Sequence, residues 1–371
     1  MKLELTEKQK EDQACFWAFV DEYITPNADQ YDRDEALPPV LIQKLAQRRY
    51  LVATLPEEVG GMNMDMMTYG LLTEEIGRGC ASVRNLVAVQ GMVAHAILKW
   101  GNRAQKDQWL PRIASGETLA AFALTEPDIG SDAKNITTTA TPTENGYILN
   151  GCKKWVSFGQ KADLFLILAQ CVDGIGAFLV ERSTPGFSTT PITDLLGLRA
   201  SMLAELHLDG CQIPKENLIG KEGLGFTWVV ATSLDYGRYS TACGCVGLAQ
   251  ACLAASQRYA SKRTQFGVPI KKHQLIRQML TNMIANTNAA RLLCYQAGYL
   301  RDKGAPNAIQ STLIAKYFAS TAAFQIANDA VQIHGANGCG YEYSVQRYLR
   351  DAKTMEIIEG TTQIHQVFSC L

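Results

Sequence analysis

The stretch TTTATPTENGYILNGCKKWVS, residues 137–157, decides the fold class because it breaks an otherwise helical chain. Threonines and β-branched residues dominate it, and Asn145-Gly146 is a dipeptide typical of a two-residue hairpin turn. We therefore expect two antiparallel strands joined at Asn145-Gly146, with another turn at Asn150-Gly151. Short strand-like runs continue in DLFLILAQC (163–171) and GAFLVERS (176–183). This pattern predicts a β module over residues 119–225.

Both flanks of the β module have a helical pattern. Residues 1–118 place apolar side chains three and four positions apart, as in LVAVQGMVAHAILKW (86–100). From residue 226 the pattern returns in four segments with short connections, the last being SVQRYLRDAKTMEIIEG (344–360). Four such helices predict an antiparallel bundle. The expected architecture is α+β: a helical domain (1–118), a β domain (119–225) and a four-helix bundle (226–371).

The composition limits the class of protein. Apolar residues make up 47% of the 371 residues and charged residues 19%, with a net charge of -1. This balance predicts a globular protein and argues against nucleic-acid binding, which needs an excess of Lys and Arg on one surface. The polar N-terminus MKLELTEKQKEDQ has no signal-peptide pattern, and no apolar run approaches the ~20 residues that span a bilayer. We expect a cytoplasmic protein with no membrane partner.

The cysteines and histidines show no local metal-binding spacing. The eleven cysteines are scattered without a CxxC pair, which favours reduced, buried thiols. The five histidines, at positions 95, 207, 273, 334 and 365, form no HxxxH or HExxH motif. The sequence therefore predicts no metal site.

Three loops between the expected elements are candidates for function. LTEPDIGSDAKN (124–135) enters the β module, KRTQFGVPIKKHQ (262–274) joins two helices, and HGANGCG (334–340) is a glycine-rich turn. Each has a simple structural explanation, as an N-capping turn or a helix connection. The glycine-rich turn could also bring backbone close to a flat or anionic ligand. Neither GxGxxG nor GxxxxGKS is present, so the usual nucleotide-binding fingerprints are missing.

Five motifs in this order resemble the acyl-CoA dehydrogenase flavoprotein family: LTEPDIGSD, NGCKKWVSFGQKADLFLI, RTQFGVPIKKHQ, QIHGANGCGYE and RDAKTMEIIEGTTQIH. The resemblance covers nearly the whole chain. It implies the acyl-CoA dehydrogenase fold, in which the central domain is a β-barrel, and a homotetramer or homodimer. It also implies FAD bound without a Rossmann fold, which accounts for the missing fingerprint.

The resemblance assigns cofactor roles by position. Beside the flavin ring it places Phe122, Leu124, Thr125, Ser131, Trp155 and Ser157. It implies that Arg263, Phe266 and Gln274 reach the FAD of a neighbouring subunit. Contacts to the diphosphate and adenosine portion fall on Gln332, Gly335 and Gly338, and further cofactor contacts fall on Thr361 and Gln363.

The resemblance makes Glu359, in the triplet EGT, the catalytic base. The base must remove a proton alpha to a thioester in a pocket without water, where desolvation raises a carboxyl pKa towards neutrality. Gly360 would allow a tight backbone turn, and both Gly360 and Arg238 are expected at the substrate. The family's alternative base, on the first bundle helix, is missing because Gly237 precedes Arg238. Asp235 has the wrong helical phase, and Glu356 is expected to be a surface or helix-packing acid.

The expected substrate is a small acyl thioester. The chain ends twelve residues after Glu359, without the arginine that helps to hold the CoA nucleotide in the family. SVRNLVAVQGMVAHAI, SLDYGRYSTACGCVGLAQAC and RDAKTMEIIEG are also similar to dehydrogenase-like enzymes that make methoxymalonyl, hydroxymalonyl or aminomalonyl extender units. That likeness implies an acyl group on the phosphopantetheine arm of a carrier protein, in polyketide or nonribosomal-peptide biosynthesis.

Several alternatives stay open at this point. The enzyme could be an ordinary short-chain acyl-CoA dehydrogenase of catabolism, with an electron-transfer flavoprotein as acceptor. It could instead be an oxidase that passes electrons to O2. A nucleic-acid-associated flavoprotein on this fold would need a basic face, and a structural flavoprotein without turnover would not need Glu359.

Overall fold

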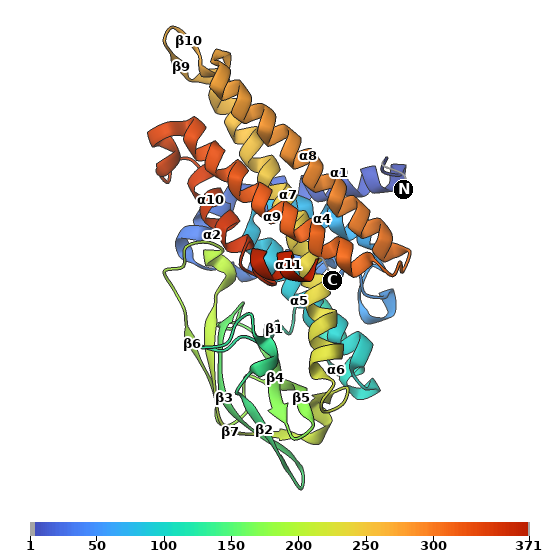
Figure 1. Cartoon of the computed structure of the whole chain (residues 1–371). Helices are drawn as coiled ribbons and strands as arrows, with labels where there is room; N and C mark the ends of the chain where they lie inside the picture. Colours follow the sequence, from blue (N-terminus) through green and yellow to red (C-terminus); the bar gives the residue numbers. More distant parts are fainter. Residues whose placement is uncertain (1–3, 370–371) are drawn as a thin grey trace.

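The computed structural model describes residues 4–369 and divides into a helical body and a sheet (Figure 1). The first helices are α1 (Glu7–Tyr23), α2 (Ala28–Asp34), α3 (Pro39–Gln47), α4 (Met66–Gly79), α5 (Ala81–Trp100) and α6 (Arg103–Ala114). The later helices are α7 (Ala231–Lys262), α8 (Gln274–Asp302), α9 (Ala308–His334), α10 (Val345–Met355) and α11 (Thr362–Phe368). The α–β–α order expected from the sequence is confirmed.

Eight strands, which follow α6 and precede α7 in the sequence, form the sheet at one end of the molecule (Figure 1). They are β1 (Ala120–Ala123), β2 (Thr139–Thr143), β3 (Gly146–Val156), β4 (Leu164–Cys171), β5 (Gly174–Glu181), β6 (Phe187–Pro191), β7 (Ala204–Pro214) and β8 (Leu218–Ile219). The order is β6-β7-β3-β2-β4-β5-β8, and β1 pairs with β4 in parallel. Side chains from β1 to β5 and β7, among them Phe165, Phe178 and Leu206, share one core separate from the main helical core. The sheet therefore curves around an interior of its own, as in a barrel.

The hairpin at Asn145-Gly146 is confirmed, but the expected turn at Asn150-Gly151 is wrong. Thr143 pairs with Gly146 across the turn between β2 and β3. Strand β3 runs straight through Asn150, and its register against β7 shifts between Leu149 and Gly151. Gly151 has a φ of 143°, which a β-bulge tolerates. The glycine thus bends a strand instead of ending it.

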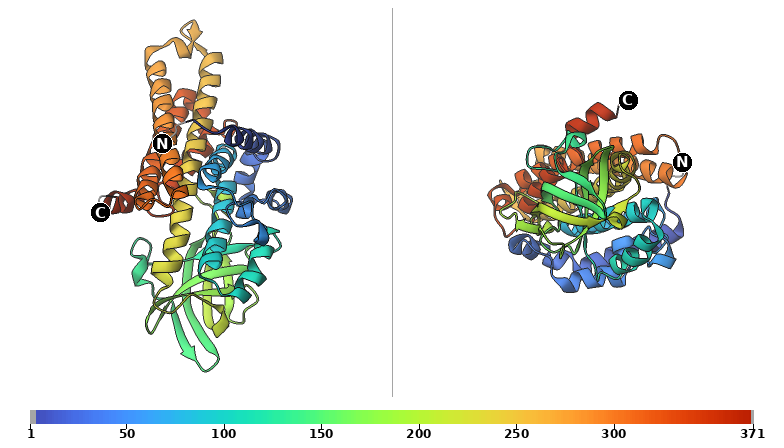
Figure 2. Two further views of the ribbon diagram at one scale, coloured as in Figure 1. Left: turned by 90° about the vertical axis from the view of Figure 1, so that its right-hand side faces the viewer. Right: turned by 90° about the horizontal axis from the view of Figure 1, so that it is seen from below.

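Helices α7, α8 and α9 are the long members of the C-terminal part, and α7 reaches from the sheet to the far end of the molecule. Figures 1 and 2 show the short hairpin of β9 (Thr264–Gln265) and β10 (Val268–Pro269), which joins α7 to α8, at the end opposite the sheet. The expected fourth helix, over 344–360, is only partly right. Helix α10 ends at Met355, and a bend separates it from α11.

Helix α5 lies in the middle of the helical core. It is long and apolar enough to cross a membrane by length and composition, with a mean hydropathy of 1.2 in its most apolar window. That window is 89% buried inside the protein, as expected of a core helix. It packs against α4, α6 and α7, so the segment that most resembles a membrane span is part of the interior.

Candidate functional site

The bend between α10 and α11 has an unusual backbone. Glu359 has a φ of 58° and Gly360 a φ of 99°, so two consecutive residues lie in the left-handed region. This region is unfavourable for a residue with a side chain, and such residues often mark functional positions. Arg238 Nε donates to the Glu359 carbonyl at 3.0 Å, and Lys316 Nζ donates to the Gly360 carbonyl at 2.8 Å. Two cations therefore hold this bend: the half-buried Arg238 of α7 and the buried Lys316 of α9.

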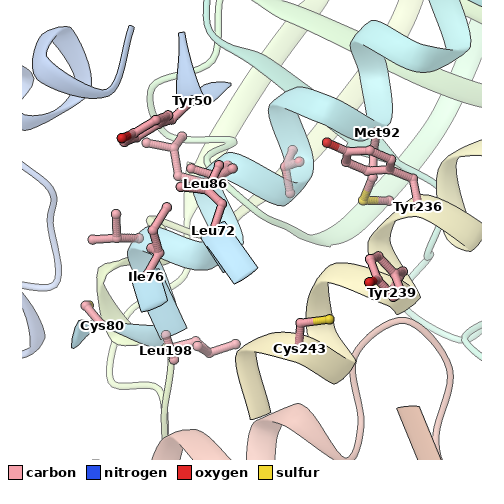
Figure 3. Close-up of a cluster of buried hydrophobic side chains, with 14 of the residues drawn as sticks. Tyr50, Leu72, Ile76, Cys80, Leu86, Met92, Leu198, Tyr236, Tyr239 and Cys243 are labelled. Carbon is pink, nitrogen blue, oxygen red and sulfur yellow. The ribbon is translucent and has the colours of Figure 1, made fainter. Parts of the chain in front are cut away.

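The side chain of Glu359 points back against α7. A Cβ placed on Gly237 would lie 2.7 Å from Glu359 Oε2 and 2.8 Å from Met92 Sδ, so the carboxylate needs a glycine there. Figure 3 shows Met92 of α5 and Tyr236 of α7 in the same region of the core. Glu359 as a residue is half-buried, but its Oε2 is inaccessible and has no hydrogen-bond partner among the described residues. A buried carboxylate oxygen without a partner is costly and suggests a functional role.

Three cations surround this carboxyl group without pairing with it. Burial raises the pKa of Glu359, and the charges of Arg238, Arg84 and Lys316 oppose that rise only in part. Burial also lowers the pKa of Lys316 to about 8. The pKa of Glu359 therefore lies above its ordinary value, as expected of a group that accepts a proton near neutral pH.

Sequence reasoning missed Arg84, which is completely buried on α5. Its guanidinium donates to Thr241 Oγ1 at 3.2 Å and contacts Met355 Sδ at 3.3 Å, while Nε has no partner. Among residues 4–369 it forms no salt bridge with a carboxylate. Thr241 lies one turn along α7 from Gly237, which places Arg84 about 6 Å along the helix from the Glu359 carboxylate. The available signal was an arginine inside an otherwise apolar helical segment.

The other two acids of the C-terminal stretch have structural contacts. Asp351 accepts a hydrogen bond from the Leu198 backbone N–H at 2.7 Å and lies 3.7 Å from Arg347, so it ties α10 to the sheet domain. Burial raises the pKa of Asp351 to about 6. Glu356 pairs with Lys353 at 2.8 Å. Asp235, excluded by phase, pairs with Arg301 at 2.7 Å.

The residues predicted beside the flavin ring lie in or just after β1 and at the end of β3, except one. Phe122 lies in β1, and the Thr125 carbonyl accepts from the Lys154 N–H at 2.9 Å. Ser157 Oγ accepts from Asn85 of α5 at 3.0 Å. Trp155 is 50% exposed, with Lys154 Nζ 5.4 Å from the centroid of its ring, so a flat ligand could stack on the exposed part of the ring. Leu124 is buried beside them, whereas Ser131 lies exposed in the loop between β1 and β2.

The residues predicted at the distal part of the cofactor lie at the far end of the bundle. Phe266 is 94% exposed at the tip of the β9–β10 hairpin, and Gln274 begins α8. Arg263 lines a cavity of about 550 Å³ together with Arg258, Lys262, His334 and Asn337. Gln332, Gly335 and Gly338 lie at the end of α9 and in the turn that follows it. The structure thus brings the glycine-rich turn to a basic cavity beside the end of α7 that points away from the sheet (Figure 1).

Near the bend, Thr361 and Gln363 lie at the start of α11. The Thr361 side chain caps this helix by accepting from the Ile364 N–H at 3.3 Å, and Gln363 is exposed. Burial lowers the pKa of His365 to about 4, so it is neutral here. These residues fit a flavin: hydroxyl groups and an exposed tryptophan ring at one end suit the ring system, and the basic cavity suits a diphosphate.

Comparisons with known proteins agree with this geometry. Residues 6–117, 121–211 and 223–367 match the N-terminal, middle and C-terminal domains of acyl-CoA dehydrogenase. Mouse mitochondrial short-chain specific acyl-CoA dehydrogenase is 38% identical, over 94% of this chain and 86% of its own length. Glutaryl-CoA dehydrogenase of Desulfococcus multivorans is also 38% identical, over 95% and 93%.

Solved structures give the same result. Butyryl-CoA dehydrogenase of Megasphaera elsdenii has a TM-score of 0.95 at 33% identity, covering 100% of this chain and 99% of that one. FkbI, described as acting in biosynthesis of a methoxymalonyl extender unit, has a TM-score of 0.87 at 29% identity, covering 96% and 98%. The family is FAD-dependent, and FAD is the implied cofactor. With three matching domains and these relatives, the chain belongs to the acyl-CoA dehydrogenase family.

Proposed function

We propose that this protein is an FAD-dependent oxidoreductase that dehydrogenates a small acyl thioester, with Glu359 as the catalytic base. The observation that carries the proposal is the buried, unpartnered Oε2 of Glu359, held in a left-handed bend. This oxygen would take the proton from the carbon alpha to the thioester. Bound FAD would supply the acceptor for the beta hydrogen, which leaves as hydride. The reaction then leaves a double bond between the alpha and beta carbons.

Arg238 and Lys316 position the base in this proposal. Both donate to carbonyl oxygens of the bend, so their charges lie near the carboxylate while its oxygens stay free for substrate. The sequence placed Arg238 and Gly360 at the substrate. Their described contacts are within the bend, and we assign them first to holding its conformation.

The FAD would lie against residues of two subunits. Phe122, Leu124, Thr125, Trp155 and Ser157 are proposed at the ring system, with Ser131 reaching it from the adjacent loop, and Thr361 and Gln363 near the bend. Arg263, Phe266 and Gln274, with Gln332, Gly335 and Gly338, would hold the distal half of a neighbouring subunit's cofactor. The β9–β10 hairpin, which carries Phe266, lies at the end of the molecule opposite the sheet (Figure 2), and this separation supports a homodimer or homotetramer.

We further propose that the acyl group carries a negative charge at the end remote from the thioester. Arg84 is a buried cation without a carboxylate partner among residues 4–369. It contacts Thr241 of α7, one helical turn from Gly237, which lies against Glu359. A carboxylate delivered by the substrate would satisfy Arg84. This agrees with a dicarboxylic acyl group that has hydrogen on its beta carbon, such as the glutaryl group for which one relative is named.

Arg84→Met is expected to remove this preference. The matched probes are butyryl and succinyl thioesters. They differ only in the terminal group, which is a methyl group in butyryl and a carboxylate in succinyl. Flavin reduction by the succinyl probe should lose at least ~30-fold in kcat/KM, since truncating one member of a buried charge pair costs about 2 kcal/mol or more. The butyryl probe should change much less. An unchanged ratio between the two probes would rule out Arg84 as the acyl-end ligand.

The tether is proposed to be the phosphopantetheine arm of a carrier protein in extender-unit biosynthesis. The support is the similarity to FkbI, while the other relatives are named for CoA thioesters. The test presents one acyl group both on CoA and on a carrier protein and follows anaerobic flavin bleaching. We expect at least tenfold higher kcat/KM with the carrier protein. Equal or better turnover on CoA would favour a short-chain acyl-CoA dehydrogenase of catabolism.

The electron acceptor is either an electron-transfer flavoprotein or O2. After anaerobic bleaching, admission of air separates the two: reoxidation within a turnover time supports an oxidase, and slow reoxidation supports a flavoprotein partner.

A further inference from the structure

A cysteine, a glutamate and a histidine meet on the face of the sheet formed by β3, β7 and β6. Cys152 and His207 are direct partners across the antiparallel ladder of β3 and β7. Glu205 lies two residues before His207 on β7, so both side chains point to the same face. All three side chains are half-buried. None belongs to the residues assigned above to the flavin or the substrate.

The three side chains place their potential ligand atoms within 4.8 Å of one another. Cys152 Sγ lies 3.4 Å from Glu205 Oε1 and 3.9 Å from His207 Nδ1. Tetrahedral zinc, with bonds of about 2.3 Å to sulfur and about 2.0–2.2 Å to nitrogen and oxygen, holds such atoms about 3.3–3.6 Å apart. Glu205 Oε1 lies 3.8 Å from His207 Nε2, so a cation could bind after side-chain rotations that bring Oε1 and Nδ1 to the same point.

Neighbouring side chains hold the ligands in the orientation that a metal requires. Thr190 of β6 lies 3.1 Å from His207 Nε2, which leaves Nδ1 facing the thiol. Lys154 Nζ lies 3.6 Å from Glu205 Oε2, which leaves Oε1 on the side of Cys152. Such outer partners of the ligating residues are typical of protein metal sites.

We propose that Cys152, Glu205 and His207 bind one Zn²⁺ ion, with water as the fourth ligand. Binding would replace the thiol proton, which is released to solvent, by a zinc–sulfur bond. The ion would join β3 to β7 three residues before Trp155 and stabilise the strand that carries it. Local spacing gave no sign of this site, because the cysteine lies 53 and 55 residues from its partners and meets them only across the ladder.

The test is zinc binding by the full chain after dialysis against a chelator. Titration of Zn²⁺ against a chromophoric competitor should show one tight equivalent, and Co²⁺ should give a thiolate-to-cobalt charge-transfer band. Cys152→Ala and His207→Ala should each weaken binding by at least ~100-fold and abolish the band. Cys171→Ala, a matched half-buried cysteine of the same sheet, should retain both.

Three further outcomes decide the proposal. Glu205→Gln keeps the size of the side chain and should still weaken zinc binding, and circular dichroism of the metal-free variants verifies that each is folded. A wild-type chain that takes up no zinc, or a folded Cys152→Ala that binds as tightly as wild type, overturns the site. Flavin content and flavin reduction are measured on the same samples, so failure here is distinguishable from failure of the proposed dehydrogenation.

Discussion

Replacing Glu359 with Gln is expected to lower the rate of anaerobic flavin reduction by about 10³-fold, while FAD content and the unfolding midpoint stay near wild type. An amide of the same shape cannot accept the alpha proton, and general-base catalysis contributes about 10²–10⁴-fold. The measurement is stopped-flow bleaching with the thioester that reduces wild type best. The wild-type rate itself should fall as pH decreases through the raised pKa of Glu359, because only the carboxylate accepts a proton.

Two variants complete this experiment. Glu356→Gln removes a neighbouring acid that pairs with Lys353, and it should change the rate less than threefold. Gly237→Ala leaves Glu359 in place but puts a methyl group 2.7 Å from its Oε2, so it should also slow bleaching by displacing the carboxylate. A Glu359→Gln enzyme that bleaches at the wild-type rate would refute the assignment of the base.

Glu126→Ala is expected to cost about 3–5 kcal/mol of folding free energy, the largest stability effect that we predict. Glu126 and Lys153 are both buried and lie 2.8 Å apart inside the sheet domain. Removing the carboxylate takes the counter-charge from buried Lys153, whose pKa burial already lowers to about 8, and it also leaves the backbone N–H groups of Thr137 and Thr138 without their acceptor. Urea unfolding followed by circular dichroism measures the shift in midpoint.

The free energy of unfolding at acidic pH gives a second test of the Glu126–Lys153 pair. Burial favours the neutral acid, but hydrogen bonds from Lys153, Thr137 and Thr138 outweigh it and lower the pKa of Glu126 to about 2. Its stabilisation is therefore complete above the unfolded value of 4.5 and is lost as pH falls towards 2. The double variant Glu126→Met/Lys153→Met should recover much of the loss, and Glu144→Ala, in the exposed hairpin turn, should cost almost nothing. A cost below 1 kcal/mol for Glu126→Ala would contradict the pairing.

Local patterns predicted the large features of this fold because their causes are local. The strand pattern of residues 137–157 and the Asn145-Gly146 turn depend on neighbouring residues, and both are confirmed. The end of α10 was missed because the helical pattern continues through Glu359, whereas cations from α7 and α9 hold that residue in a left-handed conformation. The dipeptide Asn150-Gly151 has the composition of a turn, which is why a turn was predicted. In the structure its pairing with β7 makes it a β-bulge.

The site divides in the same way. Glu359 was found through a motif, but its buried oxygen and its contact with Gly237 are properties of the tertiary structure. Arg84 was missed because the feature that marks it is the absence of a carboxylate partner. A single sequence does not show which charged residues pair. The ligands Cys152 and His207 were missed because only the register of two strands brings them together.

The position of α5 has a consequence for how the protein is made in the cell. Arg84 reaches Thr241, its partner on α7, across 157 residues of chain. At a synthesis rate of about 5–20 residues per second, α5 leaves the ribosome roughly 8–30 s before that partner exists. During this interval the apolar surface of α5 and Arg84, both buried in the folded protein, are exposed. The helix is also apolar enough to enter a bilayer. We therefore expect nascent chains halted before α7 to depend on chaperones.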